Sequence, residues 1–310
     1  MAMKKNLKTL FAVTFMLSLG CVLSMPSIAG YRSGKAVQQI QNTKNQACVK
    51  QEPRALQVNL SRQDMRDMEL AQSYMRYQRA QGQSPFVIKS LYRASIRTGV
   101  SFELLLLKAS LESDMGRLNE AARSSARGVF QYIEPTWLIL MNRYGAKIGH
   151  PEYAKAIKIS NKQGFPYFKG NDKHLRSEIL ALRYDDDISA LIKAYQIIEE
   201  TDVIRGYKGG KKVSATDHYI AHMMGLNLAK DFYDLKRKNS ILVVARLKNP
   251  QMREAAMLNK IFFYKKRVPL TAPQAYVQFE RRVGRELKKI RNVAKYNGNP
   301  SCVFASAEVN

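Results

Sequence analysis

The stretch Leu104–Leu138, LLLLKASLESDMGRLNEAARSSARGVFQYIEPTWL, decides the fold of this chain. Its run of leucines favours a strongly apolar helix, for which Ser101 is a suitable cap and Gly116 a natural stop. The helix predicted over Phe102–Met115 carries an acidic residue, Glu112, in its last turn, and a loop of small residues follows. The leucines would bury such a helix, and its last turn would deliver one carboxyl group to the edge of the core.

Apolar residues recur at helical spacing along most of the chain, and no stretch alternates convincingly as a half-buried strand would. The predicted helices cover about residues 62–81, 85–98, 102–115, 135–144, 186–200, 214–236, 251–266 and 273–295. Residues 146–177 hold several glycines and two prolines and are expected to form a looser excursion. The sequence therefore predicts an all-α protein with one principal domain.

The first 29 residues have the three parts of an export signal. A basic start is followed by an apolar run over Leu10–Met25 and by small residues at Ser27 and Ala29. The apolar run is shorter than the roughly 20 residues that a membrane-spanning helix needs. We therefore expect a signal peptide over residues 1–29, cleavage before Gly30, and an exported protein that is not an integral membrane protein. An N-terminal anchor that is never cleaved is the alternative.

The rest of the chain divides by composition. Residues 30–60 are polar and predict an irregular segment, residues 61–235 predict the main domain with a leading helix, and residues 236–310 predict a basic helical extension. Loss of residues 1–29 would lower the formal net charge from +26 to +23, because that segment holds three lysines and no acid. A basic surface favours polyanionic partners. For an exported protein the bacterial wall fits better than nucleic acid, and the chain has no recognisable nucleic-acid module.

Two cysteines, Cys48 and Cys302, would remain after cleavage of the signal peptide. In an oxidising compartment a disulfide between them would join the two ends of the mature chain. Cys21 offers a different outcome as a lipidated cysteine, but the residues before it match a lipidation signal poorly. No cysteine or histidine spacing predicts a metal site, and no cofactor is expected.

Four short blocks occur in order along the middle of the chain: ES at 112–113, SSARGVFQYIEPTW at 124–137, ILALRYDDDISAL at 179–191 and TDHYIAHMMGLNLAKDFY at 216–233. Together they resemble the SLT-type lytic transglycosylases of bacteria, over about residues 88–235. The resemblance implies a goose-lysozyme-like helical domain with helical N- and C-terminal extensions. It also implies a periplasmic or wall-associated lyase that cleaves the β-1,4 bond between N-acetylmuramic acid and N-acetylglucosamine in peptidoglycan.

The resemblance also assigns the site. Glu112 is expected to be the catalytic acid and base. The substrate-binding residues that it implies are Ser113, Ser124, Ser125, Gly128, Gln131 and Tyr219, with Tyr219 facing Glu112 from a later helix and the small residues letting a sugar approach the backbone. Burial and the dipole at the end of the helix both disfavour a negative charge, so we expect the pKa of Glu112 to be raised. An acid that stays protonated near neutral pH suits a general acid.

The last block departs from the commoner family pattern, because the chain has His-Tyr-Ile-Ala-His at 218–222 where many members have Ala-Tyr-Asn-Ala-Gly. Arg127 also stands where a small residue is usual. His218 and His222 have the spacing of zinc ligands on a helix, but Tyr219 occupies the position where metalloproteases need a glutamate. We therefore expect one histidine in the core and the other at the rim of the site.

Two further features have structural interpretations. Asp185–Asp187 could be read as a cation site or a second catalytic carboxylate, but acids at the start of a helix favour capping. Trp137 could stack on a sugar, but at a helix start it is more often a core residue.

Two other functions remain as alternatives to a transglycosylase. A hydrolytic muramidase on the same fold would add water to its product. A non-catalytic, basic wall-binding or scaffold protein would not need Glu112. The expected partners are peptidoglycan glycan strands and, depending on the biological role, a machine of the cell envelope.

Overall fold

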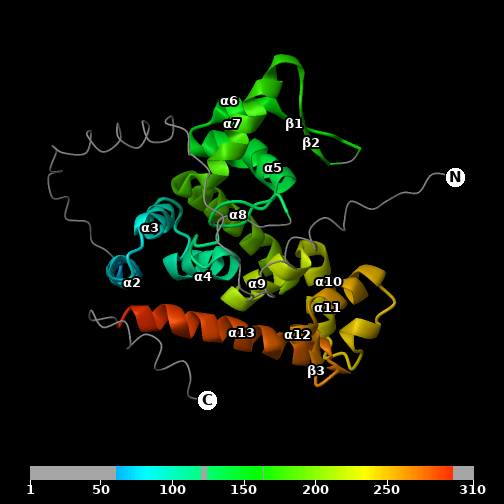
Figure 1. Ribbon diagram of the computed structural model, residues 1–310. Coiled ribbons are helices and arrows are strands. Elements are labelled where there is room, and N and C mark those ends of the chain that lie inside the picture. Colours follow the sequence, from blue (N-terminus) through cyan, green and yellow to red (C-terminus); the bar gives the residue numbers. More distant parts are fainter. Residues whose placement is uncertain (1–60, 119, 121–123, 163, 296–310) are drawn as a thin grey trace, which may run out of the picture.

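The computed structural model describes residues 61–118, 120, 124–162 and 164–295 (Figure 1). Helices dominate this part of the chain, so the prediction of an all-α protein is confirmed. No helix in these ranges combines the length and the apolar character that crossing a membrane requires. The predicted signal peptide, the segment 30–60 and Cys21, Cys48 and Cys302 lie outside the described residues.

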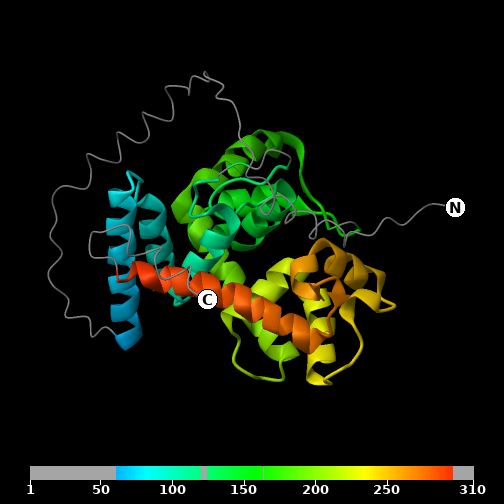
Figure 2. The same cartoon turned by 60° about the horizontal axis from the view of Figure 1, so that its bottom comes forward.

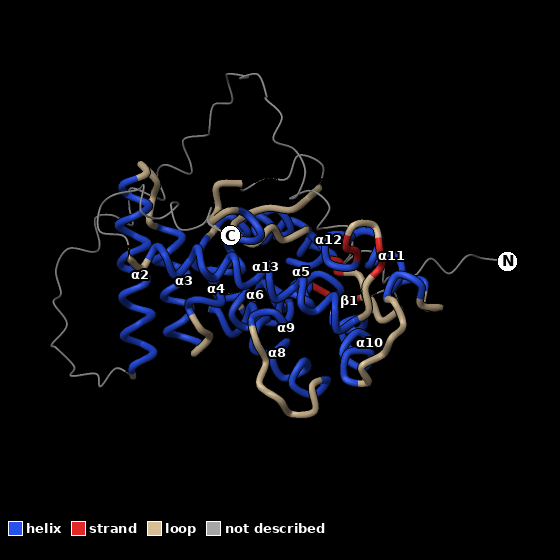
Figure 3. The backbone as a smooth tube through the Cα atoms, turned by 90° about the horizontal axis from the view of Figure 1, so that it is seen from below, coloured by secondary structure: helices blue, strands red, loops and turns tan. Residues whose placement is uncertain are grey.

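Twelve α-helices follow one another along the described part of the chain. They are α2 (Arg62–Ala80), α3 (Phe86–Thr98), α4 (Phe102–Ser113), α5 (Glu134–Tyr144), α6 (Pro151–Ala156), α7 (Leu175–Ala181), α8 (Asp186–Tyr207), α9 (Ala215–Met224), α10 (Leu226–Arg237), α11 (Pro250–Leu258), α12 (Lys260–Phe263) and α13 (Ala272–Val293). Strands β1 (Ile157–Ile159) and β2 (Pro166–Phe168) form one antiparallel hairpin, and β3 (Tyr264–Lys265) and β4 (Val268–Pro269) form another. Figure 3 shows these strands as short red segments among the helices.

Helix α4 lies in the middle of the fold, as its leucines predict. Leu105, Leu106 and Leu107 are almost completely buried. Helices α3 and α8 pack along each other and also contact α4, while α13 crosses α4 and reaches α2 at one end and α12 at the other (Figure 2). The C-terminal end of α4 therefore stands where elements from both halves of the chain meet.

The hydrophobic core continues past residue 235, the predicted end of the main domain. Rings from α9, α10, α12 and α13 form one aromatic cluster. Phe262 and Phe279 stack with centroids 4.2 Å apart, and Tyr219 meets Phe262 edge-on at 5.8 Å. Phe232 also packs edge-on against Phe279. Helices α12 and α13 thus belong to the same core as the predicted site.

Several predicted element boundaries are wrong. The helix predicted over 214–236 is two helices, because Gly225 adopts φ 76° and ψ 152° between α9 and α10. The helix predicted over 251–266 ends early and gives way to the β3–β4 hairpin. Two residues with positive φ, Lys266 and Arg267, make the turn of that hairpin. Neither is a glycine or an asparagine, so the sequence carried no turn signal there.

Candidate active site

Glu112 lies in the last turn of α4 beside His222 of α9. The side chain of Glu112 is 10 % exposed, and its Oε1 lies 2.6 Å from Nε2 of His222, whose side chain is 27 % exposed. His218 is buried one turn earlier on α9. The prediction of one core histidine and one rim histidine is therefore confirmed, but the sequence did not indicate that the rim histidine contacts Glu112.

A set of buried charges surrounds this pair. Lys108, one turn before Glu112 on α4, is buried and its Nζ donates a hydrogen bond of 3.1 Å to the carbonyl oxygen of His218. Lys193 of α8 is buried with its Nζ 4.6 Å from the centre of the Tyr132 ring. Glu200, also on α8, lies 3.8 Å from His218 through Oε2 and Nδ1. Two lysines and two glutamates thus share one poorly hydrated region.

The electrostatic balance of this region favours an ionised Glu112. Burial acts to raise the pKa of Glu112, but His222, Lys193 and Lys108 oppose it, and the pKa lies below its ordinary value. The predicted raised pKa is therefore wrong. Two of these three groups, Lys193 and His222, come from α8 and α9, far away in sequence, so the pattern around Glu112 could not reveal them. The same burial lowers the pKa of Lys193 to about 8.

Ser113 fixes the loop that follows α4. Its side chain is fully buried, and its Oγ donates to the carbonyl oxygen of Val129 at 2.7 Å and accepts from the backbone N–H of Gly116 at 2.8 Å. With no exposed surface, Ser113 cannot contact a ligand directly. It holds the loop that contains residues 124–131 against the end of α4.

Gly128 and Gln131 shape that loop from inside. Gly128 has φ 74°, and a Cβ at this position would lie only 1.9 Å from the carbonyl oxygen of Arg183. The backbone of Arg183 therefore fills the space that a side chain at position 128 would occupy, so only glycine fits there. Gln131 has φ 47°, and its Nε2 donates to the carbonyl oxygens of Gly128 at 2.8 Å and Leu118 at 2.9 Å.

The two loop serines join the loop to its surroundings while keeping access to solvent. Ser124 is partly exposed, and its Oγ accepts from the backbone N–H of Ala126 at 3.2 Å. Ser125 is exposed, and its Oγ accepts from the N–H of Glu134 at the start of α5 at 3.3 Å. Arg183 donates to the Ser125 carbonyl oxygen at 2.6 Å. Of the six expected substrate-binding residues, these two are the best placed to touch a ligand.

Tyr219 stands behind the site, in the aromatic cluster. Its side chain is 2 % exposed. Burial raises the pKa of Tyr219 to about 12, and a hydrogen bond from Arg282 of α13 and the nearby charge of Glu112 also act on it. Tyr219 lies close enough to Glu112 for the charge of Glu112 to raise its pKa, and Arg282 lies outside the four sequence blocks.

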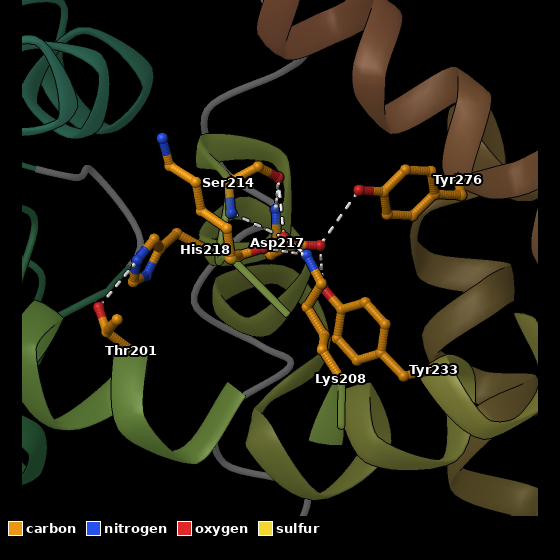
Figure 4. A network of polar contacts seen from close by, with 8 residues as sticks. Thr201, Lys208, Ser214, Asp217, His218, Tyr233 and Tyr276 are labelled. Atoms are coloured by element: carbon orange, nitrogen blue, oxygen red, sulfur yellow. Dashed lines mark hydrogen bonds and ion pairs between the residues drawn. The ribbon is translucent and has the colours of Figure 1, made fainter. Parts of the chain in front are cut away.

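Asp217, which was not among the predicted site residues, anchors the start of α9 (Figure 4). It is completely buried, and its Oδ1 accepts from the hydroxyls of Tyr233 at 2.9 Å and Tyr276 at 3.1 Å. Its Oδ2 accepts from the backbone N–H and hydroxyl of Ser214 and from the ammonium group of Lys208. The Ser-x-x-Asp spacing of a capping box was the signal that could have identified it.

The predicted capping and core roles are confirmed at two other positions. Oδ1 of Asp185 accepts from the N–H groups of Asp187 and Ile188 and so caps α8. Trp137 is fully buried and its Nε1 donates to the carbonyl oxygen of Ile179 at 2.7 Å. Trp137 is therefore not available to stack on a sugar.

The arrangement offers one carboxyl group that can give and take a proton. Its partner, the imidazole of His222, is more exposed than the carboxyl group. Among the residues that the structure describes, no group of three His, Cys, Asp or Glu side chains could hold a metal ion. A scan of the sequence against protein-family models found no family model that matches this chain.

Proposed function

We propose that this protein is a peptidoglycan lytic transglycosylase with a goose-lysozyme-like fold. The observation that carries the proposal is that the blocks at 112–113, 124–137 and 216–233 meet at the end of α4, and that the block at 179–191 contacts the second of these through Arg183. Glu112 stands there, Ser113 ties the 124–131 loop to it, and α8 and α9 supply the charged neighbours. Sequence resemblance alone placed these blocks in order along the chain, whereas the fold brings them together in space.

The reaction needs one group that first donates and later accepts a proton. Glu112 protonates the leaving glycosidic oxygen as the bond to C1 of the muramic acid breaks. The carbonyl oxygen of the substrate's own N-acetyl group bonds to C1 and replaces the second carboxylate of ordinary glycosidases. The ionised Glu112 then takes the proton of the 6-hydroxyl, whose oxygen closes on C1 and releases the acetamido oxygen. No water is consumed, and the product carries a 1,6-anhydro bond.

The proton for the first step resides in the Glu112–His222 pair. The neighbouring lysines lower the pKa of Glu112, and a proton held by the pair is shared across the 2.6 Å contact between Oε1 of Glu112 and Nε2 of His222. A sugar oxygen that approaches Glu112 shifts this proton onto the carboxyl group and then to the leaving oxygen. The active form is therefore the protonated pair, and activity is expected to fall as the pH rises and the pair loses its proton.

The products of digestion test the proposal. Purified sacculi incubated with the protein should release muropeptides lighter than hydrolysed ones by one water, about 18 Da, since no water is added across the glycosidic bond. Mass spectrometry of the soluble fraction measures this directly. Ordinary reducing ends would identify a hydrolytic muramidase instead, and the absence of any released fragment would favour a non-catalytic wall-binding protein.

Lys193→Met should shift the alkaline side of the pH–activity profile to higher pH. Lys193 is one of the cations that lower the pKa of Glu112, so its removal raises that pKa and keeps the proton in the pair at higher pH. The expected shift is roughly one pH unit. It should be measured below pH 8, where Lys193, with a pKa of about 8, is still largely charged.

Lys147→Met is the matched control, because Lys147 also lies over tyrosine rings, at 5.9 Å from the centre of Tyr144 and 5.5 Å from that of Tyr195, but does not act on Glu112. Its profile should coincide with that of the unchanged protein. An unmoved profile in folded Lys193→Met would contradict the assigned role of the buried lysine.

A further inference from the structure

One end of the molecule combines positive charge with exposed apolar side chains. Residues 236–268, from the end of α10 to β4, contain ten lysines and arginines and a single acidic residue, Glu254. The same segment holds five large apolar side chains that are largely exposed: Ile241 at 89 %, Val268 at 63 %, Leu242 at 57 %, Ile261 at 56 % and Met257 at 48 %. Scattered single exposed apolar residues need no explanation, but five within one short basic segment do.

Backbone contacts bring the parts of this segment together. Val243 pairs with Thr271, and the N–H of Val244 donates to the carbonyl oxygen of Leu270 at 3.1 Å, so the loop after α10 runs beside the end of the β3–β4 hairpin. The N–H of Leu270 in turn donates to the carbonyl oxygen of Phe263 in α12 at 2.9 Å. In Figure 1, α11, α12 and β3 gather at one end of the molecule.

The hairpin presents a basic tip beside an apolar residue. Lys265 and Val268 are directly paired, so their side chains leave the same face of the hairpin. Lys266 and Arg267 form the turn, both in the left-handed region at φ 47° and 68°, where glycine or asparagine is usual. A turn built from two long cationic residues accepts backbone strain and projects two charges away from the core.

Most of the cations at this end are not used for internal ion pairs. Arg237 pairs with Asp234 and Arg291 pairs with Glu103. In the described part of the chain, the cations without any ion pair include Lys238, Lys260, Lys265, Lys266 and Arg267. Together with Ile241, Leu242, Met257, Ile261 and Val268 they form what we call the basic-apolar end.

We propose that the basic-apolar end docks the protein on the anionic surface of a phospholipid bilayer. Lysine and arginine side chains are attracted to acidic head groups, and exposed aliphatic side chains insert between them, so both components of this surface are used. A polyanionic polymer would need the cations only. Single-stranded nucleic acid would need exposed aromatic rings for base stacking, and the phenylalanines of this segment are buried. The inference does not depend on the proposed enzymatic activity.

Vesicle co-sedimentation tests the proposal with the purified full chain. Vesicles of phosphatidylcholine with about 30 % phosphatidylglycerol should bind it at least about tenfold more tightly than vesicles of phosphatidylcholine alone. The triple variant Ile241→Ser, Leu242→Ser, Val268→Ser should lose at least about tenfold of that binding, although its charge is unchanged. The triple variant Lys265→Gln, Lys266→Gln, Arg267→Gln should lose a similar factor.

A control removes the same charge elsewhere. The variant Lys162→Gln, Lys169→Gln, Lys173→Gln changes three exposed lysines around the β1–β2 hairpin, which lies far from β3 in Figure 1, and should bind as the unchanged protein does. Equal losses in the control and the basic-apolar variants would mean that net charge alone drives binding and would overturn the proposal. Full binding by the serine variant would also overturn it, in favour of a polyanion site.

A fluorescence measurement gives an independent result. The chain has one tryptophan, Trp137, which is fully buried and supplies a constant background. Val268→Trp should therefore show a blue shift and an intensity gain on addition of anionic vesicles if this position enters the head-group region. An unchanged spectrum would contradict the proposal. A second result would also contradict the proposal: the protein forms a dimer in solution, the serine variant dissociates that dimer, and vesicles are not bound. The surface would then be a protein interface.

Discussion

Glu112→Gln is expected to lower the release of muropeptides from sacculi at least about 100-fold while the protein stays folded. Glutamine has the shape of glutamate, and its amide oxygen can still accept the N–H of His222. It cannot carry the proton that the leaving oxygen needs, nor take one from the 6-hydroxyl. Both halves of the proposed reaction therefore fail at the same atom, and the loss should appear in the turnover rate.

The accompanying measurement is a titration of Lys193. The charge of Glu112 raises the pKa of Lys193, although burial lowers it overall to about 8. Removal of the carboxylate should therefore lower the pKa of Lys193 further, which a nuclear magnetic resonance titration of its side chain detects. This result does not depend on the enzymatic assay, so it distinguishes a wrong site geometry from a wrong reaction.

Glu103→Gln is the matched control on the same helix. Glu103 lies in the first turn of α4 and pairs with Arg291 at 2.6 Å on an exposed surface. Exposed pairs contribute at most about 1 kcal/mol, so activity and stability should change little. If Glu112→Gln digests sacculi as fast as Glu103→Gln does, Glu112 is not the acid.

The parts of the fold that the sequence predicted well depend on local signals. The leucine run and Ser101 are enough to place α4 and to put Glu112 in its last turn, although the helix ends at Ser113, before the predicted stop at Gly116, and Ser101 makes no side-chain capping hydrogen bond. Asp185 and Trp137 were predicted from their positions at helix starts, where capping and core packing follow from neighbouring residues. In each case the residues that determine the outcome lie within a few positions of one another.

The parts that could not be predicted depend on contacts between distant segments. His222 and Lys193 lower the pKa of Glu112 only because the fold brings α9 and α8 to the end of α4, so a local estimate of that pKa had the wrong sign. The need for glycine at position 128 likewise comes from a distant segment, because the backbone of Arg183 lies where a side chain would be. The local sequence pattern contains no sign of such contacts between distant segments. This is why the direction of the pKa shift of Glu112 was predicted wrongly.

Asp217→Asn is expected to lower the free energy of unfolding by about 3 kcal/mol, the loss typical when one member of a buried ion pair is removed. The carboxylate of Asp217 is completely buried and accepts from Ser214, Tyr233, Tyr276 and Lys208. An asparagine keeps one carbonyl oxygen but leaves Lys208 without its anion and places an N–H₂ group against other donors. For a domain of this size the melting temperature should fall by roughly 10 °C.

The pH dependence of stability gives the same prediction a second, independent measurement. Burial acts to raise the pKa of Asp217, but Lys208, Ser214 and Tyr233 hold it below its ordinary value of 3.8. A carboxyl group with a lowered pKa in the folded state stabilises the protein above its unfolded-state pKa, and that contribution is lost as the pH falls through the folded-state value. Unfolding in urea at a series of pH values should therefore show a steeper loss of stability below about pH 4 in the unchanged protein than in Asp217→Asn.

Tyr276→Phe separates the ion pair from the hydrogen bonds around it. This variant removes one hydroxyl that donates to Asp217 at 3.1 Å and keeps the carboxylate and Lys208, so it should cost only about 1 kcal/mol and keep the acid dependence. Because Asp217 fixes the start of α9, which carries His222, the asparagine variant should also lose activity at temperatures where it is still folded. If the melting temperature of Asp217→Asn lies within a degree or two of that of Tyr276→Phe, the buried charge does not hold α9 in place. The geometry of the Glu112–His222 pair must then be set by the packing of Tyr219 in the aromatic cluster.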